Sequence, residues 1–340
     1  MKPVKIAQIG IGHNHADATM QTLRKFPQYF DVVGVAEDDP AWLAKRRGLK
    51  AYEGLDFKSE AELLATPGLE AICVEKDVPD NEAAALRCAR LGLPIHMDKP
   101  GGEDYTAFRE LVEMQRRAGR AFQMAYMYRY NPAIRQCLDM ARNGDLGDIF
   151  EIDCQMSTTH SPAYRQWLSN FKAGDMYIFG SHLIDLIVYM MGEPETVVTH
   201  NINSFPEEAE CIDNGLAVLQ YPRATCTVRT TSLEANGYHR RQLVVCGTKG
   251  TVEIKPMENP TKMSIAWREA SGGPGAPDAR EWIDVPDFGG RYDAQLIDFA
   301  RIVRGEIENP FGYDHELAVE RTLLRACGID FVQDTESDCQ

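Results

Sequence analysis

The segment of residues 9–17, Ile-Gly-Ile-Gly-His-Asn-His-Ala-Asp, could support either of two kinds of chemistry. Gly10 and Gly12 have the spacing of a dinucleotide-binding loop, whose first glycine makes a tight turn and whose second lets the backbone approach a pyrophosphate. His13 and His15 have the spacing of a His-x-His metal site. At a helix start these two side chains are expected to point apart, so no metal site is predicted.

The runs on either side of this segment are typical of a nucleotide-binding fold. Short β-branched runs at 4–10 and 32–36 predict buried parallel strands, and the apolar rhythm of 13–26 predicts a helix between them. Glu37 follows the second strand near the spacing of about 20 residues at which an acid binds the ribose. A carboxylate there accepts hydrogen bonds from both ribose hydroxyls and repels a 2′-phosphate, which favours NAD and makes NADP the weaker candidate.

The pattern of the chain changes near residue 125. Strands and helices alternate up to that point, which predicts an α/β fold with a Rossmann dinucleotide-binding domain over residues 1–125. Over residues 126–340, β-branched runs follow one another without helices and predict an α+β domain with a large, open, mostly antiparallel sheet. These runs are 149–158, 195–203, 215–221, 224–233, 243–247 and 251–255, and 270–280 is predicted as a loop. Helices are predicted near 132–142, 293–303 and 314–327, of which the last could pack back on the first domain.

The composition excludes several classes of partner. The formal net charge of −15 over 340 residues disfavours nucleic acid and anionic membranes. No run approaches the roughly 18 apolar residues of a membrane span. The nine cysteines form no C-x-x-C pair and the N-terminus has no signal-peptide pattern, so a reduced, cytoplasmic protein is expected.

Several motifs together resemble the Gfo/Idh/MocA family of NAD(P)-dependent oxidoreductases. Asp98-Lys99-Pro100 stands where that family has Glu-Lys-Pro. Further similar stretches are YMYRYNP (126–132), NGDLGDI (143–149), GSHLIDLIVYMMG (180–192) and YDAQLIDFARIVRG (292–305). The resemblance implies hydride transfer between a nicotinamide and a secondary alcohol of a sugar, cyclitol or related polyol, and a homodimer or homotetramer. The candidate cofactor-binding residues are Gly10, Ile11, Gly12, His13, Asn14, His15, Glu37, Glu75, Asp98 and Lys99.

The resemblance also implies catalytic residues. The hallmark lysine, here Lys99, contacts the nicotinamide ribose and the substrate hydroxyl in the family. Of the family's Asp-x-Gly-x-His-x-x-Asp pattern, His182 matches the acid/base histidine and Asp185 the last aspartate. The first aspartate falls on Ile178, which cannot exchange a proton, and Asp175 is the nearby carboxylate three residues earlier.

Two segments bear on substrate choice. The segment 159–167 carries aromatic and basic side chains that could stack on a sugar and bind its hydroxyls, or serve only packing. Around Glu75, the chain replaces the family's Thr-Pro loop with charged residues, and Asn81 stands where a histidine is common. The candidate substrate-binding residues are Tyr126, Arg129, His160, Tyr164, Arg165, Trp167 and Tyr177.

Three functions remain open from the sequence. The first is an NAD-dependent dehydrogenase in which Lys99 and His182 remove the hydroxyl proton. The second is a redox-neutral glycosidase or lyase that keeps NAD tightly bound and regenerates it in each cycle. The third is a catalytically impaired NAD-binding sensor, for which Ile178 is the main support.

Overall fold

The structure is a computed structural model that describes residues 2–331. Its described part forms two compact units. Unit 1 consists of residues 2–127 and 290–317 with Phe331, and unit 2 of residues 128–289 and 318–330. Each unit has its own sheet and is described by itself.

Unit 1 contains a six-stranded parallel sheet in the order β3-β2-β1-β4-β5-β6. Its strands are β1 (Val4–Ile9), β2 (Phe30–Ala36), β3 (Phe57–Lys58), β4 (Ala71–Val74), β5 (Ile95–Met97) and β6 (Phe122–Met124). β4, β5 and β6 are buried along their whole length, as expected of parallel strands covered on both faces. This order is that of a doubly wound nucleotide-binding sheet, so the predicted Rossmann fold is confirmed.

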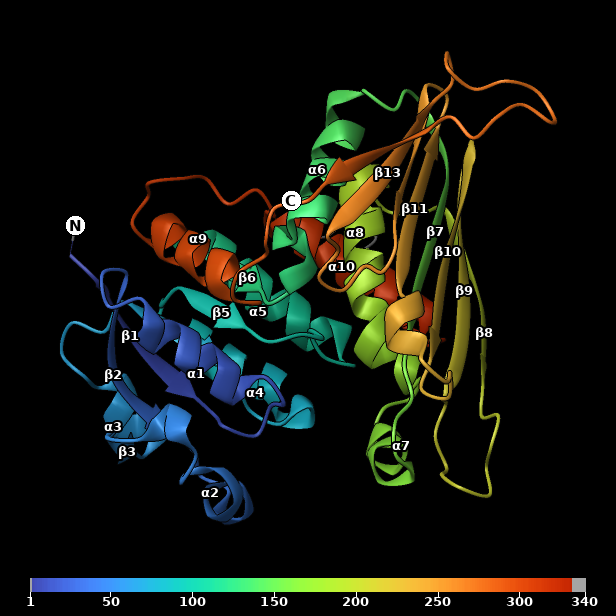
Figure 1. Ribbon diagram of the computed structural model, residues 1–340. Helices are drawn as coiled ribbons and strands as arrows, with labels where there is room; N and C mark the ends of the chain where they lie inside the picture. Colours follow the sequence, from blue (N-terminus) through green and yellow to red (C-terminus); the bar gives the residue numbers. More distant parts are fainter. Residues whose placement is uncertain (1, 332–340) are drawn as a thin grey trace, which may run out of the picture. The chain divides into compact units, whose positions relative to one another are not determined.

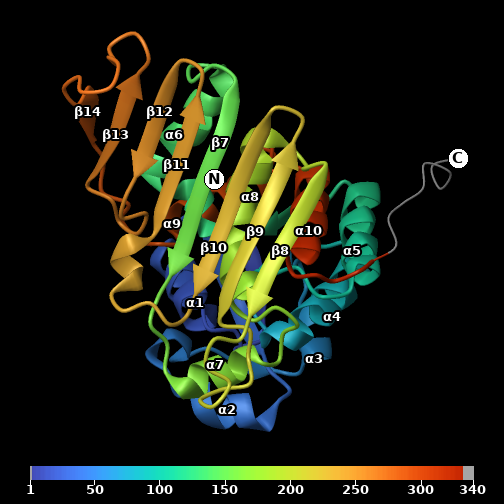
Figure 2. The same cartoon turned by 90° about the vertical axis from the view of Figure 1, so that its right-hand side faces the viewer.

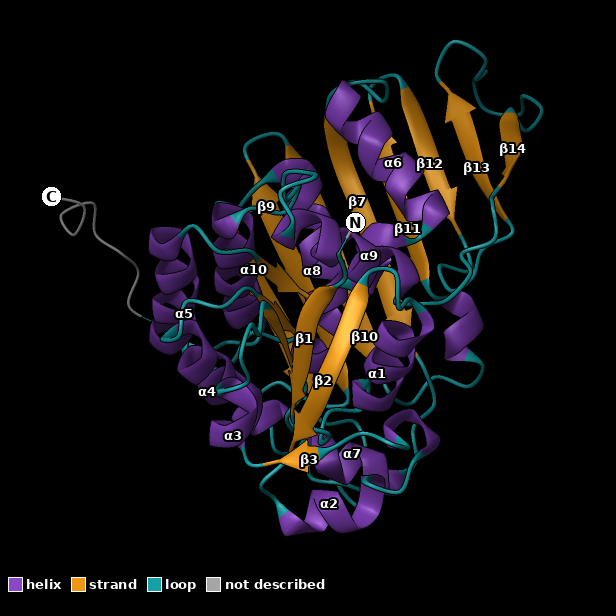
Figure 3. Ribbon diagram, turned by 90° about the vertical axis from the view of Figure 1, so that its left-hand side faces the viewer, coloured by secondary structure: helices purple, strands orange, loops and turns teal. Residues whose placement is uncertain are grey.

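Helices cover both faces of this sheet. They are α1 (Ala16–Lys25), α2 (Pro40–Arg46), α3 (Glu60–Leu64), α4 (Val78–Ala89), α5 (Tyr105–Ala118) and α9 (Asp293–Val303). α1 packs beside α9 and α4 beside α5 (Figure 1). Figure 3 shows the two pairs on opposite faces of the sheet. Local signals set the helix ends: Asp104 caps the start of α5, and Gly119 ends it in the left-handed conformation.

Unit 2 contains an eight-stranded sheet in the order β14-β13-β12-β11-β7-β10-β9-β8 (Figure 2). Its strands are β7 (Ile149–Ser157), β8 (Thr196–Ile202), β9 (Asn214–Tyr221), β10 (Ala224–Thr231), β11 (Gln242–Gly247), β12 (Gly250–Ile254), β13 (Lys262–Trp267) and β14 (Arg280–Asp284). Only β7 and β10 pair in parallel, so the predicted open, mostly antiparallel sheet is confirmed. β13 and β14, which no sequence pattern predicts, add two strands at one edge.

Helices lie against one face of this second sheet. They include α6 (Pro132–Asn143), a π-helical turn (Met176–Gly180), α8 (Ser181–Met191) and α10 (Tyr313–Ala326), whose last turns belong to this unit, whereas α7 (Pro162–Leu168) lies beyond the ends of the strands (Figure 2). α8 packs on β7 and β10, and α6 on β12. Figure 2 shows the opposite face without a covering helix. Across residues 2–331, the structure contains no helix with the length and apolarity needed to cross a membrane.

Candidate functional site

The strand order of unit 1 reverses between β1 and β4, and side chains with chemical function gather at that point. Because all strands are parallel, their carboxyl ends meet at one edge of the sheet. This edge therefore receives the loop after β1, Glu37 after β2, Glu75 after β4 and Asp98 after β5. Ligands of open α/β sheets bind in such a crevice, which makes this edge the candidate cofactor site.

The two loop glycines allow a close backbone approach. Gly10 has a φ of 93°, and a Cβ on it would lie 2.3 Å from the backbone nitrogen of Lys76. A Cβ on Gly12 would lie 2.6 Å from the backbone nitrogen of Asp77. The glycines therefore let the loop after β1 pack directly on the segment after β4, and no other residue fits there.

The same loop leaves two backbone donors for a ligand. The amide of His13 donates to the Glu75 carbonyl at 3.0 Å, and that of Ile11 to Glu37 Oε2 at 2.9 Å. Within the described residues, the amides of Gly12 and Asn14 have no hydrogen-bond partner. They lie just before the N-terminus of α1, where the helix dipole favours negative charge, so the loop fits a pyrophosphate.

Glu37 is tightly bound by unit 1 itself. Its Oε1 accepts from the amides of Asp38 and Asp39 and forms a buried ion pair with Lys76 Nζ. Its Oε2 accepts the Ile11 amide and has a second lone pair that can accept a ribose hydroxyl. Sequence reasoning missed Lys76 as a partner of Glu37, because their contact joins loops that follow different strands.

Replacing Glu37 by alanine is expected to destabilise unit 1 strongly. The change leaves the ammonium of Lys76 without its buried carboxylate, and breaking such a pair costs about 3–5 kcal/mol of unfolding free energy. The double variant Glu37→Ala/Lys76→Met removes both charges and should recover a large part of that loss. Chemical denaturation of the three proteins measures this; a double variant no more stable than Glu37→Ala would contradict the role of the ion pair.

Sequence reasoning also missed an arginine at the phosphate-binding loop. Arg46, the last residue of α2, donates from Nη1 to the carbonyl of Ile11 at 3.2 Å and to that of His13. It also lies over the ring of Trp42, 5.1 Å from the ring centroid. The arginine thus places a positive charge beside a loop that fits a phosphate group.

His13 and His15 do not point apart, and that prediction is wrong. Their ring centroids are 4.9 Å apart, and the Nδ1 atoms lie 3.0 and 2.9 Å from Oδ2 of Asp98. α1 begins only at Ala16, so both histidines lie in the turn before the helix and can face the same carboxylate. Burial lowers the pKa of His15 to about 4, although Asp98 opposes this. Burial acts to raise the pKa of Asp98, but the two histidines lower it well below its usual range.

Hydrogen bonds at the same edge of the sheet hold Lys99 and the loop after β4 in place. The amide of Lys99 donates to Asp98 Oδ1 at 2.8 Å, and Lys99 is only 4 % exposed. Asn81 bridges the two loops, since its Oδ1 accepts the Lys76 amide and its Nδ2 donates to the Asp98 carbonyl. Burial, with the charge of Asp98 nearby, raises the pKa of Glu75 well above its usual range.

In unit 2, the helix α8 places His182 and Asp185 in the protein interior. His182 is 4 % exposed, and its ring meets that of Tyr128 edge-to-face at a centroid distance of 5.1 Å. Asp185 is fully buried and pairs with the guanidinium of Arg129, whose Nε and Nη2 lie 2.9 and 2.6 Å from its oxygens. This paired carboxylate anchors α8 and so positions His182.

The π-helical turn before α8 contains Ile178 and follows Asp175. Ile178 is 4 % exposed and apolar, and Asp175 is fully buried. Within the described residues, neither carboxylate oxygen of Asp175 has a geometrically well-formed hydrogen bond. Burial raises the pKa of Asp175 to about 8, and the charge of Asp213 contributes to the increase. The raised pKa favours the protonated form of Asp175 near neutral pH.

The raised pKa of Asp175 predicts a pH-dependent stability. The folded protein keeps this proton, whereas the unfolded chain releases it above the ordinary pKa of 3.8. The free energy of unfolding should therefore fall by about 1.4 kcal/mol per pH unit as the pH rises from 4 toward 8. In Asp175→Asn, the free energy of unfolding should lose this part of its dependence on pH. Denaturation at several pH values compares the two proteins, and identical slopes would contradict the assignment.

An aromatic cluster in unit 2 gathers several of the candidate substrate residues. The rings of His160 and Tyr164 stack at 4.0 Å, Phe179 stacks on His160 at 5.4 Å, and Trp167 lies 5.2 Å from Tyr164. His160 Nε2 is buried without a hydrogen-bond partner among the described residues, and burial lowers the pKa of that ring to about 4. A neutral imidazole in an aromatic cluster can bind a hydroxyl.

The remaining candidates have structural partners. Arg165 is 2 % exposed and pairs with Glu208 at 2.8 Å. Tyr177 stacks with Phe171 at a centroid distance of 5.5 Å. Tyr126, in unit 1, is 1 % exposed.

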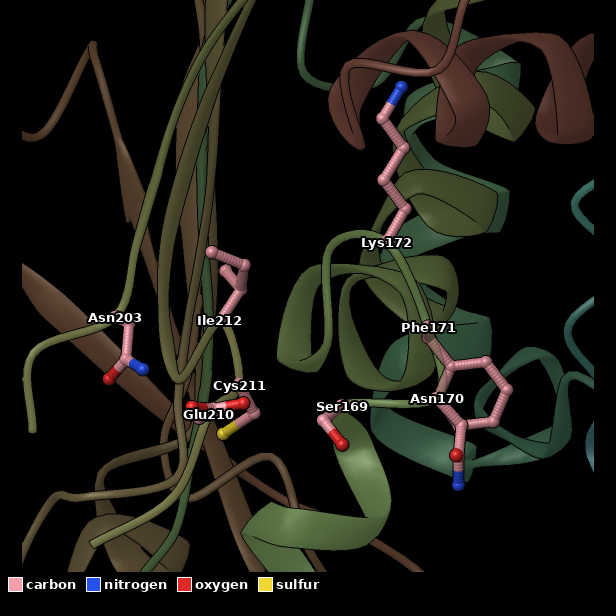
Figure 4. A pocket seen from close by; sticks show the side chains of 8 residues that line it. All are labelled: Ser169, Asn170, Phe171, Lys172, Asn203, Glu210, Cys211 and Ile212. Atoms are coloured by element: carbon pink, nitrogen blue, oxygen red, sulfur yellow. The ribbon is translucent and has the colours of Figure 1, made fainter. Parts of the chain in front are cut away.

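Sequence reasoning did not foresee a pocket of about 370 Å³ in unit 2. Its lining comes from residues 169–172, which follow α7, and from the stretch 203–212 between β8 and β9 (Figure 4). None of the candidate residues from the sequence lines it. The lining residues have neighbouring positions on connecting segments, so no periodic pattern could have indicated the pocket.

Comparisons with known proteins agree with this architecture. Residues 134–253 match the model of the GFO/IDH/MocA C-terminal domain. A bovine trans-1,2-dihydrobenzene-1,2-diol dehydrogenase is 25 % identical over 288 residues, which span 82 % of this chain and 83 % of the bovine protein.

Two solved structures share the fold at low identity. Levoglucosan dehydrogenase, in complex with NADH and levoglucosan, has a TM-score of 0.79 at 15 % identity and covers 96 % of this chain and 97 % of its own. An inositol dehydrogenase homologue from Azotobacter vinelandii, with NADH and myo-inositol, has a TM-score of 0.78 at 17 % identity and covers 96 % and 95 %. Residues 134–253 are thus similar to the GFO/IDH/MocA C-terminal domain, and the relatives that match most of the chain are named dehydrogenases.

Proposed function

We propose that the protein is an NAD-dependent dehydrogenase acting on a secondary alcohol of a sugar, cyclitol or related polyol. The observation that carries this proposal is the edge of the unit 1 sheet, where two unpaired amides and Glu37 lie at the switch point. The relatives support the reaction class, because their names give a diol, levoglucosan or inositol as the compound that each one oxidises or binds. All three substrates offer hydroxyl-bearing carbons.

In this proposal, the loop after β1 binds the pyrophosphate through the amides of Gly12 and Asn14, at the start of α1. Glu37 Oε2 accepts a ribose hydroxyl, and its negative charge disfavours a 2′-phosphate. Arg46 and Lys76 moderate that preference, because both bring positive charge to the same edge. The bound nicotinamide supplies the hydride acceptor.

Lys99 and His182 are the proposed proton-transfer groups. An alcohol must lose its hydroxyl proton as hydride leaves, and one group with an accessible neutral form is enough for that step. Lys99 is positioned by the Asp98 carboxylate and His182 by the Arg129–Asp185 pair. Ile178 in place of an aspartate removes one helper of the histidine, which leaves the larger share of the proton transfer to Lys99.

The His160–Tyr164 cluster is the proposed polyol-binding element of unit 2. Stacked rings bind the apolar C–H faces of a sugar, and the unpartnered His160 Nε2 is available to a hydroxyl. We also propose that the open face of the unit 2 sheet mediates pairing into a homodimer or homotetramer. Val198 and Ile202 of β8 support this, being 53 % and 54 % exposed.

Calorimetry with the two nicotinamide nucleotides tests the cofactor assignment. The full chain should bind NADH at least about tenfold more tightly than NADPH, a difference of about 1.4 kcal/mol. Glu37→Gln retains a hydrogen-bond acceptor but loses the charge, so it should reduce the difference in affinity between NADH and NADPH. Absence of NADH binding, or equal affinity for both nucleotides in the unchanged protein, would contradict the proposal.

A further inference from the structure

We propose that His13, His15 and Asp98 form a binding site for a divalent transition-metal ion of the zinc class. The three residues bring two imidazoles and one carboxylate together, with all ligand atoms within 4.8 Å of one another. These are ligand types that Zn²⁺ prefers. The proposal is independent of the proposed dehydrogenase activity.

The hydrogen bonds of His13 point to an ion. Its Nε2 lies 3.2 Å from the carbonyl of Lys99, which can only accept, so Nε2 carries the proton. In a neutral ring with that proton, Nδ1 has a lone pair, to which the His15 amide donates at 3.3 Å. Yet Oδ2 of Asp98, also a lone-pair atom, lies 3.0 Å from the same Nδ1. Either a second proton on the ring or a metal ion between the two atoms removes this conflict, and the titration described below distinguishes the two.

The surroundings have the features of a metal site's outer shell. Ligating histidines donate their other ring N–H to a carbonyl or carboxylate, as His13 does to Lys99. The Asp98 carboxylate is oriented by the Lys99 amide on Oδ1, which leaves Oδ2 toward both imidazoles. The His15 side chain is 25 % exposed and provides a route for the ion.

Glu75 supplies an independent indication. Both of its carboxylate oxygens are buried and lack a well-formed hydrogen bond within residues 2–331, and Oε2 lies 3.8 Å from His13 Nδ1. Ionising a buried carboxyl group that lacks a well-formed hydrogen bond is costly, and a divalent ion would stabilise the ionised forms of Glu75 and Asp98 together. Glu75 is therefore the candidate fourth ligand. Neighbouring ligand atoms of a tetrahedral zinc site lie about 3.3 Å apart, only a few tenths of an ångström beyond the His–Asp distances.

Titration of the full chain with Zn²⁺, and with Co²⁺ as a spectroscopic probe, tests the site. The expected result is one tightly bound ion per chain and an intense visible Co²⁺ spectrum of the tetrahedral type. His15→Gln should weaken Zn²⁺ binding by at least about 100-fold and abolish the spectrum, because losing an outer-shell partner alone costs about 10–100-fold. Asp98→Asn is the second variant, and circular dichroism confirms that both variants fold.

The matched control is His239→Gln, which removes an exposed histidine of unit 2 and should leave affinity and spectrum unchanged. Equal binding by the unchanged chain, His15→Gln and Asp98→Asn would overturn the proposal, since the ion would then sit elsewhere. Absence of binding by the unchanged chain would overturn it too. NADH calorimetry on the metal-free protein separates these outcomes from any failure of the proposed dehydrogenase function.

Discussion

Replacing Lys99 by methionine is expected to lower kcat for polyol oxidation by about 10²- to 10⁴-fold. A positioned general acid/base contributes that much, and methionine keeps the length and packing of the buried stem without a titratable group. Affinity for NADH should change far less than kcat. Steady-state kinetics together with calorimetry separates the two effects.

Two companion variants sharpen this test. Lys99→Arg retains the positive charge but cannot release its proton near neutral pH, so it should be as impaired as Lys99→Met if the lysine transfers a proton. Lys262→Met alters an exposed lysine of β13 and should be fully active. Undiminished kcat in both Lys99→Met and His182→Gln would contradict the assigned proton-transfer groups.

Replacing Gly10 by alanine is expected to cost about 2–5 kcal/mol of unfolding free energy. The residue has a φ of 93°, which an L-side chain rarely adopts, and the new Cβ would lie 2.3 Å from the Lys76 backbone nitrogen. Backbone atoms cannot swing away as a flexible side chain can. The loop after β1 and the segment after β4 must therefore separate, and thermal or chemical denaturation measures the loss.

Two other glycines of unit 1 serve as controls that separate the strain of a positive φ from the steric overlap of a new Cβ. Gly54 has a φ of 75° with open space around its Cβ position, so Gly54→Ala should cost only the conformational strain of about 1–2 kcal/mol. Gly48 has neither a positive φ nor a near neighbour, and Gly48→Ala should be close to neutral. A Gly10→Ala variant no less stable than Gly54→Ala would contradict the close packing of the two loops.

Sequence periodicity predicted the elements with strong local signals. Continuous apolar runs predicted β1 and β2, and α9 was predicted over the range that the structure shows, because each has a local pattern of burial. β13 and β14 were missed, since they are edge strands with little apolar patterning. In β14, the residues Arg280–Asp284 are almost all exposed, so neighbouring strands rather than their own side chains determine the pairing.

The candidate site was predictable only in part. Glu37 could be located from its distance along the chain, because a strand–helix–strand unit fixes that spacing. Its pairing with Lys76, and the meeting of His13 with Asp98, join segments that follow different strands. Such contacts depend on strand order and loop conformation, which no local pattern specifies. The orientation of His15 was predicted wrongly for the same reason, since its partner Asp98 lies far along the chain.

The most direct test of the proposed function is turnover of a panel of sugars, cyclitols and vicinal diols by the purified full chain with NAD⁺. The proposed function predicts that at least one substrate yields NADH and the corresponding ketone in equal amounts. Product formed without net NADH would instead indicate a redox-neutral glycosidase or lyase. NADH binding without conversion of any substrate would indicate a sensor, and either outcome would contradict the dehydrogenase.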